Sequence, residues 1–272
     1  MTTRNVLVAH SCLRKVNFEE RVRIAAEAGF NSVGLNAGSI SNRGGEYKRL
    51  IDLGYDDARM QRILDEHALK IAEVEALVIG NDEQARTCRH LVETFGVDTI
   101  QTIAMFRVDG ESEPLDIDAA AQWLRNFATE LVPYGTKLAL EFIPTTPIPD
   151  ASTAQRLADA AGHPNVGTCV DFWHVMRGRG ISELDVVDWN RVYNVQVNDG
   201  TLVPADPNYI HDCLFYREVP GDGEFPIDEL MARVPATAPI NMEVMNTFLD
   251  SATAAEQVAT LRRGRERVLS RG

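Results

Sequence analysis

Four residues that carry a carboxylate or an amide each stand at the end of a short apolar run, in KLALE, VGTCVD, RVYNVQ and INME. They are Glu141, Asp171, Gln196 and Glu243. Carboxylate and amide oxygens are ligands that hard divalent cations such as Mg²⁺ and Mn²⁺ accept. Four polar ends on successive runs therefore predict one all-oxygen site for a divalent cation, provided that these ends meet in space.

The runs alternate with longer segments of helical periodicity, which is the pattern of βαβ units. The expected strands are Val6–Ala9, Ser32–Leu35, Lys70–Val74, Thr99–Ile103, Lys137–Phe142, Val166–Asp171, Val192–Val197 and Ile240–Val244. The expected helices are Phe18–Ala28, Asp57–His67, Asp82–Phe95, Ile117–Val132, Ala151–Ala161, Glu183–Val187, Ile227–Arg233 and Ala254–Leu269. This alternation predicts a (β/α)8 TIM barrel, in which the carboxyl ends of all strands meet at one rim. An open doubly wound sheet is the alternative, but no glycine-rich phosphate-binding sequence follows the first strand.

Size and composition agree with a single barrel. The chain has 272 residues, where about 250 are typical, and no Pro/Gly/Ser-rich linker divides it, so residues 1–272 are expected to form one domain. The formal net charge of −13 argues against a nucleic-acid or anionic-membrane partner. No apolar stretch approaches the roughly 18 residues that cross a bilayer, and the N-terminal one is too short for a signal peptide.

The cysteines indicate a reducing environment. They are scattered without a C-x-x-C pair, at Cys12, Cys88, Cys169 and Cys213. This spacing is typical of reduced thiols in a cytoplasmic protein rather than of a disulfide framework or a zinc site.

Three histidines are further candidates for the site. His174 follows Asp171 by three residues. It could ligate a metal, donate a hydrogen bond to a substrate oxygen or pack beside Trp173, and the sequence leaves these roles open. His10 ends the first expected strand and His211 lies in the long segment before the seventh expected helix, so both are candidates to line the mouth of the barrel.

Arg217 lies in the same long segment, within YREVPGDGEFP. The P-G-D-G sequence is a turn signal, so its glycines have a structural role. Asp222 and Glu224 of this segment would repel a phosphate group. The segment therefore argues weakly against a phosphorylated substrate.

Five short motifs give the chain a resemblance to a known family. They are L-E-F-I-P at Leu140–Pro144, D-F-W-H at Asp171–His174, V-Q-V-N-D at Val195–Asp199, R-x-x-P-G-x-G at Arg217–Gly223 and N-M-E at Asn241–Glu243. Over nearly its whole length, the chain resembles the xylose isomerase-like TIM-barrel superfamily, the group of sugar isomerases, epimerases, and inosose or dehydroshikimate dehydratases. The motifs are fairly specific for the superfamily and poorly specific for the substrate.

The resemblance implies roles for individual residues. The positions that match metal ligands are Glu141, Asp171, Gln196 and Glu243. His174 matches a histidine that contacts substrate, and Arg217 matches an arginine that binds substrate oxygens in the epimerases. Many epimerases have His where this chain has Gln196, and glutamine there is similar to hydroxypyruvate isomerases and dehydroshikimate dehydratases. The histidine-rich cluster of the superfamily's DNA-repair endonucleases is not matched, since the chain has six His and an acidic balance.

The chemistry that the resemblance implies is removal of a proton from the carbon next to a carbonyl. A divalent cation, Mn²⁺ or Mg²⁺, stabilises the resulting enediolate, while Glu141 and Glu243 serve as base and acid. Return of the proton to the neighbouring carbon gives isomerisation, and return to the opposite face gives epimerisation. Expulsion of a β-hydroxyl instead gives dehydration.

Three functions therefore stay open at this point. The first is an isomerase or epimerase of a non-phosphorylated sugar or related hydroxy-carbonyl compound. The second is a metal-dependent dehydratase of an inosose-like or 3-dehydroshikimate-like compound. The third is a catalytically silent barrel that acts as a binding or assembly subunit, which the complete set of four ligands disfavours. The expected partner is a small polyhydroxy carbonyl compound, and the outer helices and long loops leave a homo-oligomer open.

Overall fold

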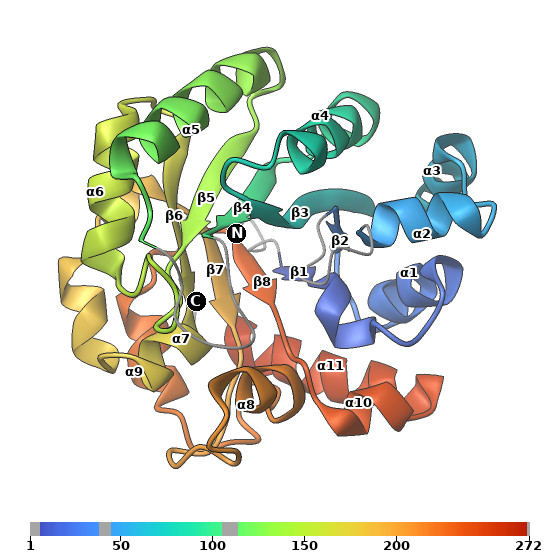
Figure 1. Ribbon diagram of the computed structural model, residues 1–272. Helices are drawn as coiled ribbons and strands as arrows, with labels where there is room; N and C mark the ends of the chain where they lie inside the picture. Colours follow the sequence, from blue (N-terminus) through green and yellow to red (C-terminus); the bar gives the residue numbers. More distant parts are fainter. Residues whose placement is uncertain (1–5, 38–44, 105–113, 271–272) are drawn as a thin grey trace.

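Parallel strands form the centre of the molecule (Figure 1). The computed structural model describes residues 6–37, 45–104 and 114–270. Within this part of the chain the strands are β1 Val6–Val8, β2 Ser32–Asn36, β3 Lys70–Val78, β4 Thr99–Ile103, β5 Lys137–Glu141, β6 Val166–Asp171, β7 Val192–Val197 and β8 Ile240–Met242. Each pairs in parallel with the next, and β8 pairs with β1, which closes the barrel. The expected α/β fold with a parallel sheet is thereby confirmed.

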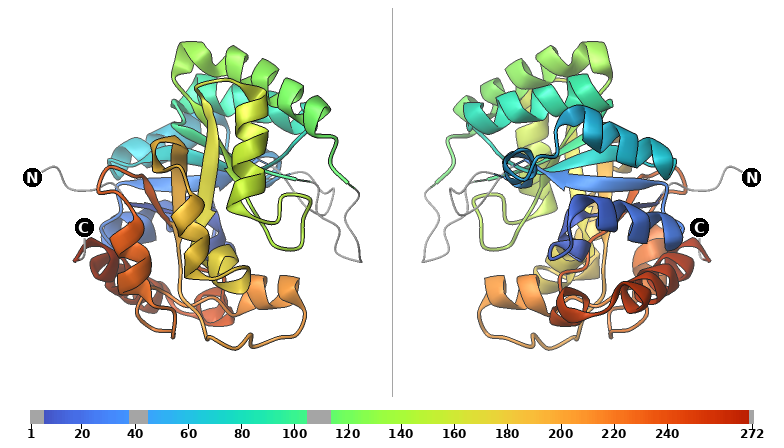
Figure 2. Two further views of the ribbon diagram at one scale, coloured as in Figure 1. Left: turned by 90° about the vertical axis from the view of Figure 1, so that its left-hand side faces the viewer. Right: turned by 90° about the vertical axis from the view of Figure 1, so that its right-hand side faces the viewer.

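Helices surround the strands on the outside, as Figures 1 and 2 show from three directions. In the described residues they are α1 Phe18–Glu27, α2 Glu46–Asp52, α3 Asp57–Glu66, α4 Asp82–Phe95, α5 Ile117–Leu131, α6 Ala151–Ala161, α7 Phe172–Arg177, α8 Tyr209–Phe215, α9 Ile227–Arg233, α10 Thr247–Ser251 and α11 Ala254–Leu269. Each longer helix buries one apolar stripe against the sheet, such as Leu124, Phe127 and Leu131 of α5. No helix among these is long and apolar enough to cross a membrane.

The elements differ from the sequence prediction in a few places. The helix expected at Glu183–Val187 is wrong, because a 3-10 helix over Ile181–Val186 stands there. In a segment this short, the few hydrogen bonds of an α-helix do not offset the unfavourable free energy of helix nucleation. The last strand ends at Met242 instead of Val244, whereas the third continues past Val74 to Val78.

Helix ends follow the capping signals of the sequence. The side chains that cap the amino ends of α1, α3, α4, α5 and α6 are Asn17, Asp56, Asn81, Asp116 and Asp150, each of which accepts a hydrogen bond from a backbone N–H of the first turn. Helices α4 and α6 end at Gly96 and Gly162, both in the left-handed conformation that glycine adopts without strain. Short αβ connections then lead directly into β4 and β6 at the face opposite the rim.

The cap of α6 supports a stability prediction. Burial alone would raise the pKa of Asp150, but hydrogen bonds from Thr153 and the charge of Arg179 lower the pKa below its usual value. A lowered folded-state pKa means that this stabilisation is present above the unfolded pKa and disappears as the pH falls through the folded pKa. Asp150→Ala should lower the free energy of unfolding by about 1–2 kcal/mol near neutral pH.

Urea unfolding of the wild type and Asp150→Ala at neutral and acidic pH measures this difference, which should shrink on acidification. Asp150→Asn is the matched control, because asparagine also caps helices but does not titrate. A difference between wild type and Asp150→Ala that is independent of pH would contradict the assigned role of the charge.

Strand β3 carries an irregularity that bears on the site. Its pairing with β4 shifts register between Val74 and Leu77. Ala76, inside this interval, has a φ of 67°, in the left-handed region that residues with a side chain rarely adopt. The backbone N–H of Ala76 donates to Oε1 of Gln101 on β4 at 2.8 Å. This local bulge sets the course of β3 where Glu75 reaches the rim.

A layer of polar side chains lies inside the barrel below the rim. The carboxylate of Glu73 on β3 accepts hydrogen bonds from the amide groups of Asn194 on β7 and Asn241 on β8. Burial and the nearby charges of Glu75 and Glu141 raise the pKa of Glu73 well above its usual value. These hydrogen bonds join three strands across the interior and so help to fix the residues directly above them.

Candidate active site

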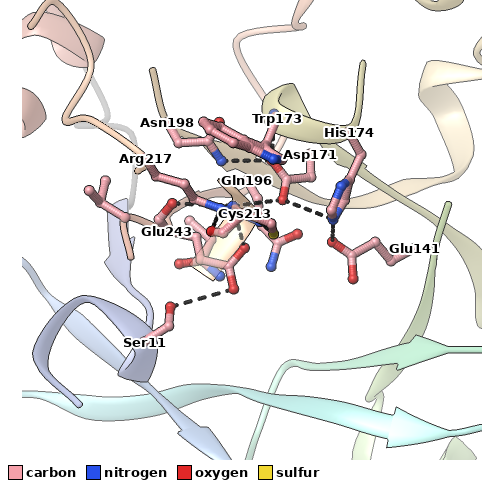
Figure 3. A network of polar contacts seen from close by, with 12 residues as sticks. Ser11, Glu141, Asp171, Trp173, His174, Gln196, Asn198, Cys213, Arg217 and Glu243 are labelled. Atoms are coloured by element: carbon pink, nitrogen blue, oxygen red, sulfur yellow. Dashed lines mark hydrogen bonds and ion pairs between the residues drawn. The ribbon is translucent and has the colours of Figure 1, made fainter. Parts of the chain in front are cut away.

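The four residues predicted as ligands all lie at the carboxyl ends of neighbouring strands. Glu141 and Asp171 are the last residues of β5 and β6, Gln196 is the next-to-last residue of β7, and Glu243 directly follows β8. Asp171 is the register partner of Gln196, and the N–H of Glu243 donates to the carbonyl of Val197 at 3.1 Å. All four are buried, and Figure 3 shows Glu141 beside His174 on one side of Asp171 and Glu243 beside Arg217 on the other.

His174 lies between two of these carboxylates. Its Nε2 is 3.1 Å from Oε1 of Glu141 and 3.5 Å from Oδ2 of Asp171. Its Nδ1 shares a hydrogen bond with the hydroxyl of Tyr209 on α8. Helix α7 presents His174 here because Oδ1 of Asp171 accepts a hydrogen bond from the N–H of Trp173 at 2.8 Å and thereby caps the helix. One ligand atom from each of Glu141, Asp171 and His174 lies within 4.8 Å of the others.

Arg217 joins the remaining carboxylates. Its Nη1 donates to Oδ2 of Asp171 at 2.9 Å and to Oε2 of Glu243 at 3.0 Å. Its Nε and Nη2 donate to the carbonyl oxygen and Sγ of Cys213 on α8. Arg217 is only 1% exposed, so these charge-assisted bonds form away from water, where they are strong.

The backbone around Arg217 is held by two antiparallel bridges, Asp199 with Glu218 and Tyr216 with Asn246. These tie the segment to the ends of β7 and β8. The Asp199 carboxylate also accepts hydrogen bonds from the N–H groups of Gly200, Gly221 and Phe225. A Cβ at Gly223 would stand 2.4 Å from Oδ1 of Asp199, so the P-G-x-G turn needs glycine at this position for packing.

The carboxyl groups of the site differ in the direction in which their surroundings shift the pKa. Burial raises the pKa of Glu141 and raises that of Glu243 well above its usual value, against the opposing effects of His174 and Arg217 respectively. Burial acts in the same direction on Asp171, but Arg217 and His174 together lower its pKa. Two carboxyl groups with raised pKa beside one that stays ionised form an arrangement suited to proton transfer near neutral pH.

The donor set also fits a divalent cation. Glu141, Asp171 and Glu243 bring three carboxylates to the site, against one guanidinium from Arg217, and a buried excess of negative charge favours a bound cation. The Oε1 of Gln196 accepts from the thiol of Cys169 at 3.2 Å, while its Nε2 is buried without a partner among the described residues. Rotation of this amide by 180° puts an oxygen ligand in place of the unpartnered nitrogen.

A cavity of about 260 Å³ opens over these residues. Its walls include Glu141, Glu243, His174, Arg217 and His10, so five of the residues singled out from the sequence share one cavity. Asp171 and Gln196 are completely buried beneath it. Among the described His, Cys, Asp and Glu residues, Glu141, Asp171 and His174 form the group that could hold a metal ion, and Glu243 is joined to Asp171 through Arg217.

Other candidates from the sequence lie elsewhere. His211 is half exposed, pairs with Asp206 at 2.8 Å and does not line the cavity. Asp222 forms a surface ion pair with Arg263, and Glu224 accepts a hydrogen bond from the N–H of Leu202. Neither acidic residue lines the cavity, so the sequence argument from them against a phosphorylated substrate does not apply. The acidic residues that do line it, Glu75, Glu141 and Glu243, disfavour a phosphate group there instead.

Several residues of the site were not singled out from the sequence. Gln101 on β4 donates to Oε2 of Glu141, and Asn198 donates to Oδ1 of Asp171 at 2.7 Å. Tyr209 contacts His174, and Glu75 lines the cavity. A signal existed for Gln101, a polar residue between apolar neighbours in TIQTI, whereas nothing in the local pattern marked Tyr209.

Comparisons with known proteins agree with this architecture. The family model described as "Xylose isomerase-like TIM barrel" matches residues 22–263. A comparison with the curated proteins finds no match. Among solved structures, the chain is similar to the IolI protein with a bound zinc atom, at 17% identity with a TM-score of 0.77 and 98% coverage of both chains.

Two further structures show the same fold. One is the probable 3-DHS dehydratase AsbF of Bacillus anthracis, at 15% identity and a TM-score of 0.69, with 95% of this chain and 97% of that chain covered. The other is a D-allulose 3-epimerase of Methylomonas sp. in complex with D-allulose, at 13% identity and a TM-score of 0.76. The match covers 99% of this chain and 98% of that chain. Enzymes that act on small polyhydroxy compounds are thus among the structures that this chain resembles.

Proposed function

The chain belongs to the xylose isomerase-like TIM-barrel family, and on that premise we propose that it is a divalent-metal-dependent isomerase or epimerase of a non-phosphorylated sugar or related hydroxy-carbonyl compound. The observation that carries the proposal is the placement of Glu141 and Glu243. Both carboxyl groups line one cavity close to the buried Asp171 and Gln196, and both have a raised pKa.

We assign Glu141, Asp171, Gln196 and Glu243 as the residues that would hold Mn²⁺ or Mg²⁺. When bound, the cation would supply Lewis-acid polarisation of the carbonyl and hydroxyl oxygens of the substrate. Asp171 suits this role best, because the hydrogen bonds from Asn198, Trp173 and Arg217 keep its carboxylate ionised and fixed.

Side chains of the protein would carry out the proton transfers and orient the substrate. One of Glu141 and Glu243 takes the proton from the carbon next to the carbonyl, and the other returns a proton to the neighbouring carbon or to the opposite face. Nε2 of His174 lies beside Glu141 and Asp171, and it would become available to a substrate oxygen once these carboxylates hold a cation. The Tyr209 hydroxyl at its Nδ1 fixes the orientation of the ring. Gln101 holds Glu141 in place through its amide group.

Dehydration of an inosose-like or 3-dehydroshikimate-like compound is the alternative, since the same groups can expel a β-hydroxyl. An arginine free to bind a substrate carboxylate would favour it. All three nitrogens of the Arg217 guanidinium already donate to protein groups, namely Asp171, Glu243 and Cys213. That observation favours isomerisation or epimerisation of a neutral compound.

The proposal is tested with purified protein that is first treated with a chelator and then supplied with Mn²⁺ or Mg²⁺. We expect no turnover without metal and recovery with it, in a panel of ketoses, inososes and 3-dehydroshikimate. Turnover in D₂O should place deuterium on the carbon next to the carbonyl, whereas loss of water from the product would establish the dehydratase.

Calorimetry should find one cation bound per chain. Turnover that survives thorough chelation, or a protein that binds no divalent cation, would refute the proposed function. Product that contains no solvent deuterium would argue against exchange of the transferred proton with solvent.

A further inference from the structure

The cavity has a second polar wall, built by the strands that carry no cation ligand. His10 follows β1, Asn36 ends β2, Glu75 lies in β3 and Gln101 in β4, and all four line the cavity. The ligands of the proposed metal come from β5 to β8, so the two sets of residues occupy opposite halves of the closed ring of strands.

His10 and Glu75 form a pair within this wall. The Nδ1 of His10 is 3.1 Å from Oε1 of Glu75. Its Nε2 is 3.8 Å from Oε2 of Glu46, too far for a hydrogen bond. Glu46 itself is buried and pairs with Arg21. Nδ1 of His10 is thus held by Glu75, whereas Nε2 can still form a further hydrogen bond.

Glu75 also retains hydrogen-bonding capacity. Its Oε1 lies 3.1 Å from Nδ1 of His10, its side chain is only 5% exposed, and the residue lines the cavity. A carboxylate has about four acceptor sites on its two oxygens, so Glu75 can accept further hydrogen bonds from a molecule in the cavity. The unusual backbone of Ala76 next to it shows that the chain accepts local strain at this place.

We infer that His10 and Glu75 form a subsite for a substrate hydroxyl remote from the carbons that react. The Nδ1–H of His10 donates to the Glu75 carboxylate, so Nε2 of this tautomer accepts, and a substrate hydroxyl can donate either to this nitrogen or to the carboxylate of Glu75. A carboxylate cannot donate, and at this place it would meet the negative charge of Glu75 with Glu46 close behind. The subsite therefore selects neutral polyols over sugar acids.

This inference rests on the proposed function and narrows its substrate class. The substrate must be long enough to place a hydroxyl at the wall of β1 to β4 while its hydroxy-carbonyl unit meets Glu141 and Glu243. A three-carbon compound supplies only the second part. A neutral chain or ring of about six carbons supplies both.

Three probes distinguish binding at the His10–Glu75 subsite from binding near Glu141 and Glu243. They are D-fructose, dihydroxyacetone and D-fructuronate. Dihydroxyacetone keeps the hydroxy-ketone unit without the remote hydroxyls, and D-fructuronate carries a carboxylate at the remote carbon. Calorimetry with Mn²⁺-loaded wild type should show D-fructose binding about tenfold or more tighter than either of the others, as expected for hydrogen bonds to charged groups.

In Glu75→Gln the affinity for D-fructose should fall about tenfold, while that for dihydroxyacetone stays the same. His10→Asn should likewise lose affinity for D-fructose but not for dihydroxyacetone, and it serves as a second, independent variant. His90→Asn is the matched control, because His90 pairs with Asp57 on the outside of the barrel. It should change the affinity for none of the probes.

Equal losses for D-fructose and dihydroxyacetone in both variants, or a wild type that does not prefer D-fructose, would overturn the subsite. Failure of the proposed function gives a different result, since it appears as the absence of cation binding in the wild type. The preference for D-fructose over D-fructuronate can then still be measured in metal-free protein, and its absence there would also overturn the subsite.

Discussion

Glu141→Gln and Glu243→Gln are each expected to lower turnover about 10²-fold or more, because an amide cannot take up or return a proton. The amide keeps an oxygen for a cation, so metal affinity should fall much less than the rate. The substitution is also nearly isosteric. In Glu141→Gln the retained oxygen can still accept the hydrogen bond that Gln101 donates, which preserves the local structure. Single-turnover kinetics together with calorimetric titration of Mn²⁺ measure the two quantities separately.

Asp171→Asn is the informative comparison for these variants. The Asp171 carboxylate is held by Arg217, Asn198 and the N–H of Trp173, so it is assigned to binding the cation rather than to moving a proton. Its metal affinity should fall together with its rate. If the two Gln variants kept near-normal turnover with metal bound, proton transfer by these glutamates would have to be abandoned.

Arg217→Met is expected to lower the free energy of unfolding of the metal-free protein by about 3 kcal/mol or more. Removal of one partner from a buried ion pair leaves the other charge uncompensated. Here a single guanidinium contacts two buried carboxylates, those of Asp171 and Glu243. Added Mn²⁺ should restore more stability to this variant than to the wild type, since the cation replaces the missing positive charge. Urea unfolding with and without Mn²⁺ measures both effects.

Arg263→Met provides the matched control for this loss. Arg263 pairs with Asp222 at the surface, where its side chain is 53% exposed, and exposed pairs contribute roughly 0–1 kcal/mol. Identical unfolding midpoints for Arg217→Met and the wild type in the absence of metal would show that the buried carboxylates do not depend on Arg217.

The strands that carry the site could be predicted from the sequence with good accuracy. The ranges Thr99–Ile103, Val166–Asp171 and Val192–Val197 agree with the structure at both ends. Strands buried on both faces are continuous apolar runs, so a polar residue at the end of such a run stands out. The rule that strand ends meet at one rim then brings Glu141 and Glu243 to the same cavity without any knowledge of tertiary contacts.

The other half of the cavity could not be predicted in this way. Glu75 lies beyond the point where the expected third strand stops, because the bulge at Ala76 breaks the alternation that a sequence pattern can detect. Tyr209 belongs to a helix of seven residues whose position depends on the segments around it. His211, two residues further on the same helix, turns away to Asp206, and only the packed structure distinguishes one from the other.

The bulge in β3 makes one wall of the cavity sensitive to a change in chain length. Side chains alternate along a strand, so the gain or loss of one residue at Ala76 would exchange inward-facing and outward-facing side chains beside it. The carboxylates of β5 to β8 lie in strands that such a change does not touch. A single-codon insertion or deletion would thus alter the β3 wall of the cavity directly, and it would act on Glu141 through Gln101, which accepts from the N–H of Ala76 and donates to Glu141.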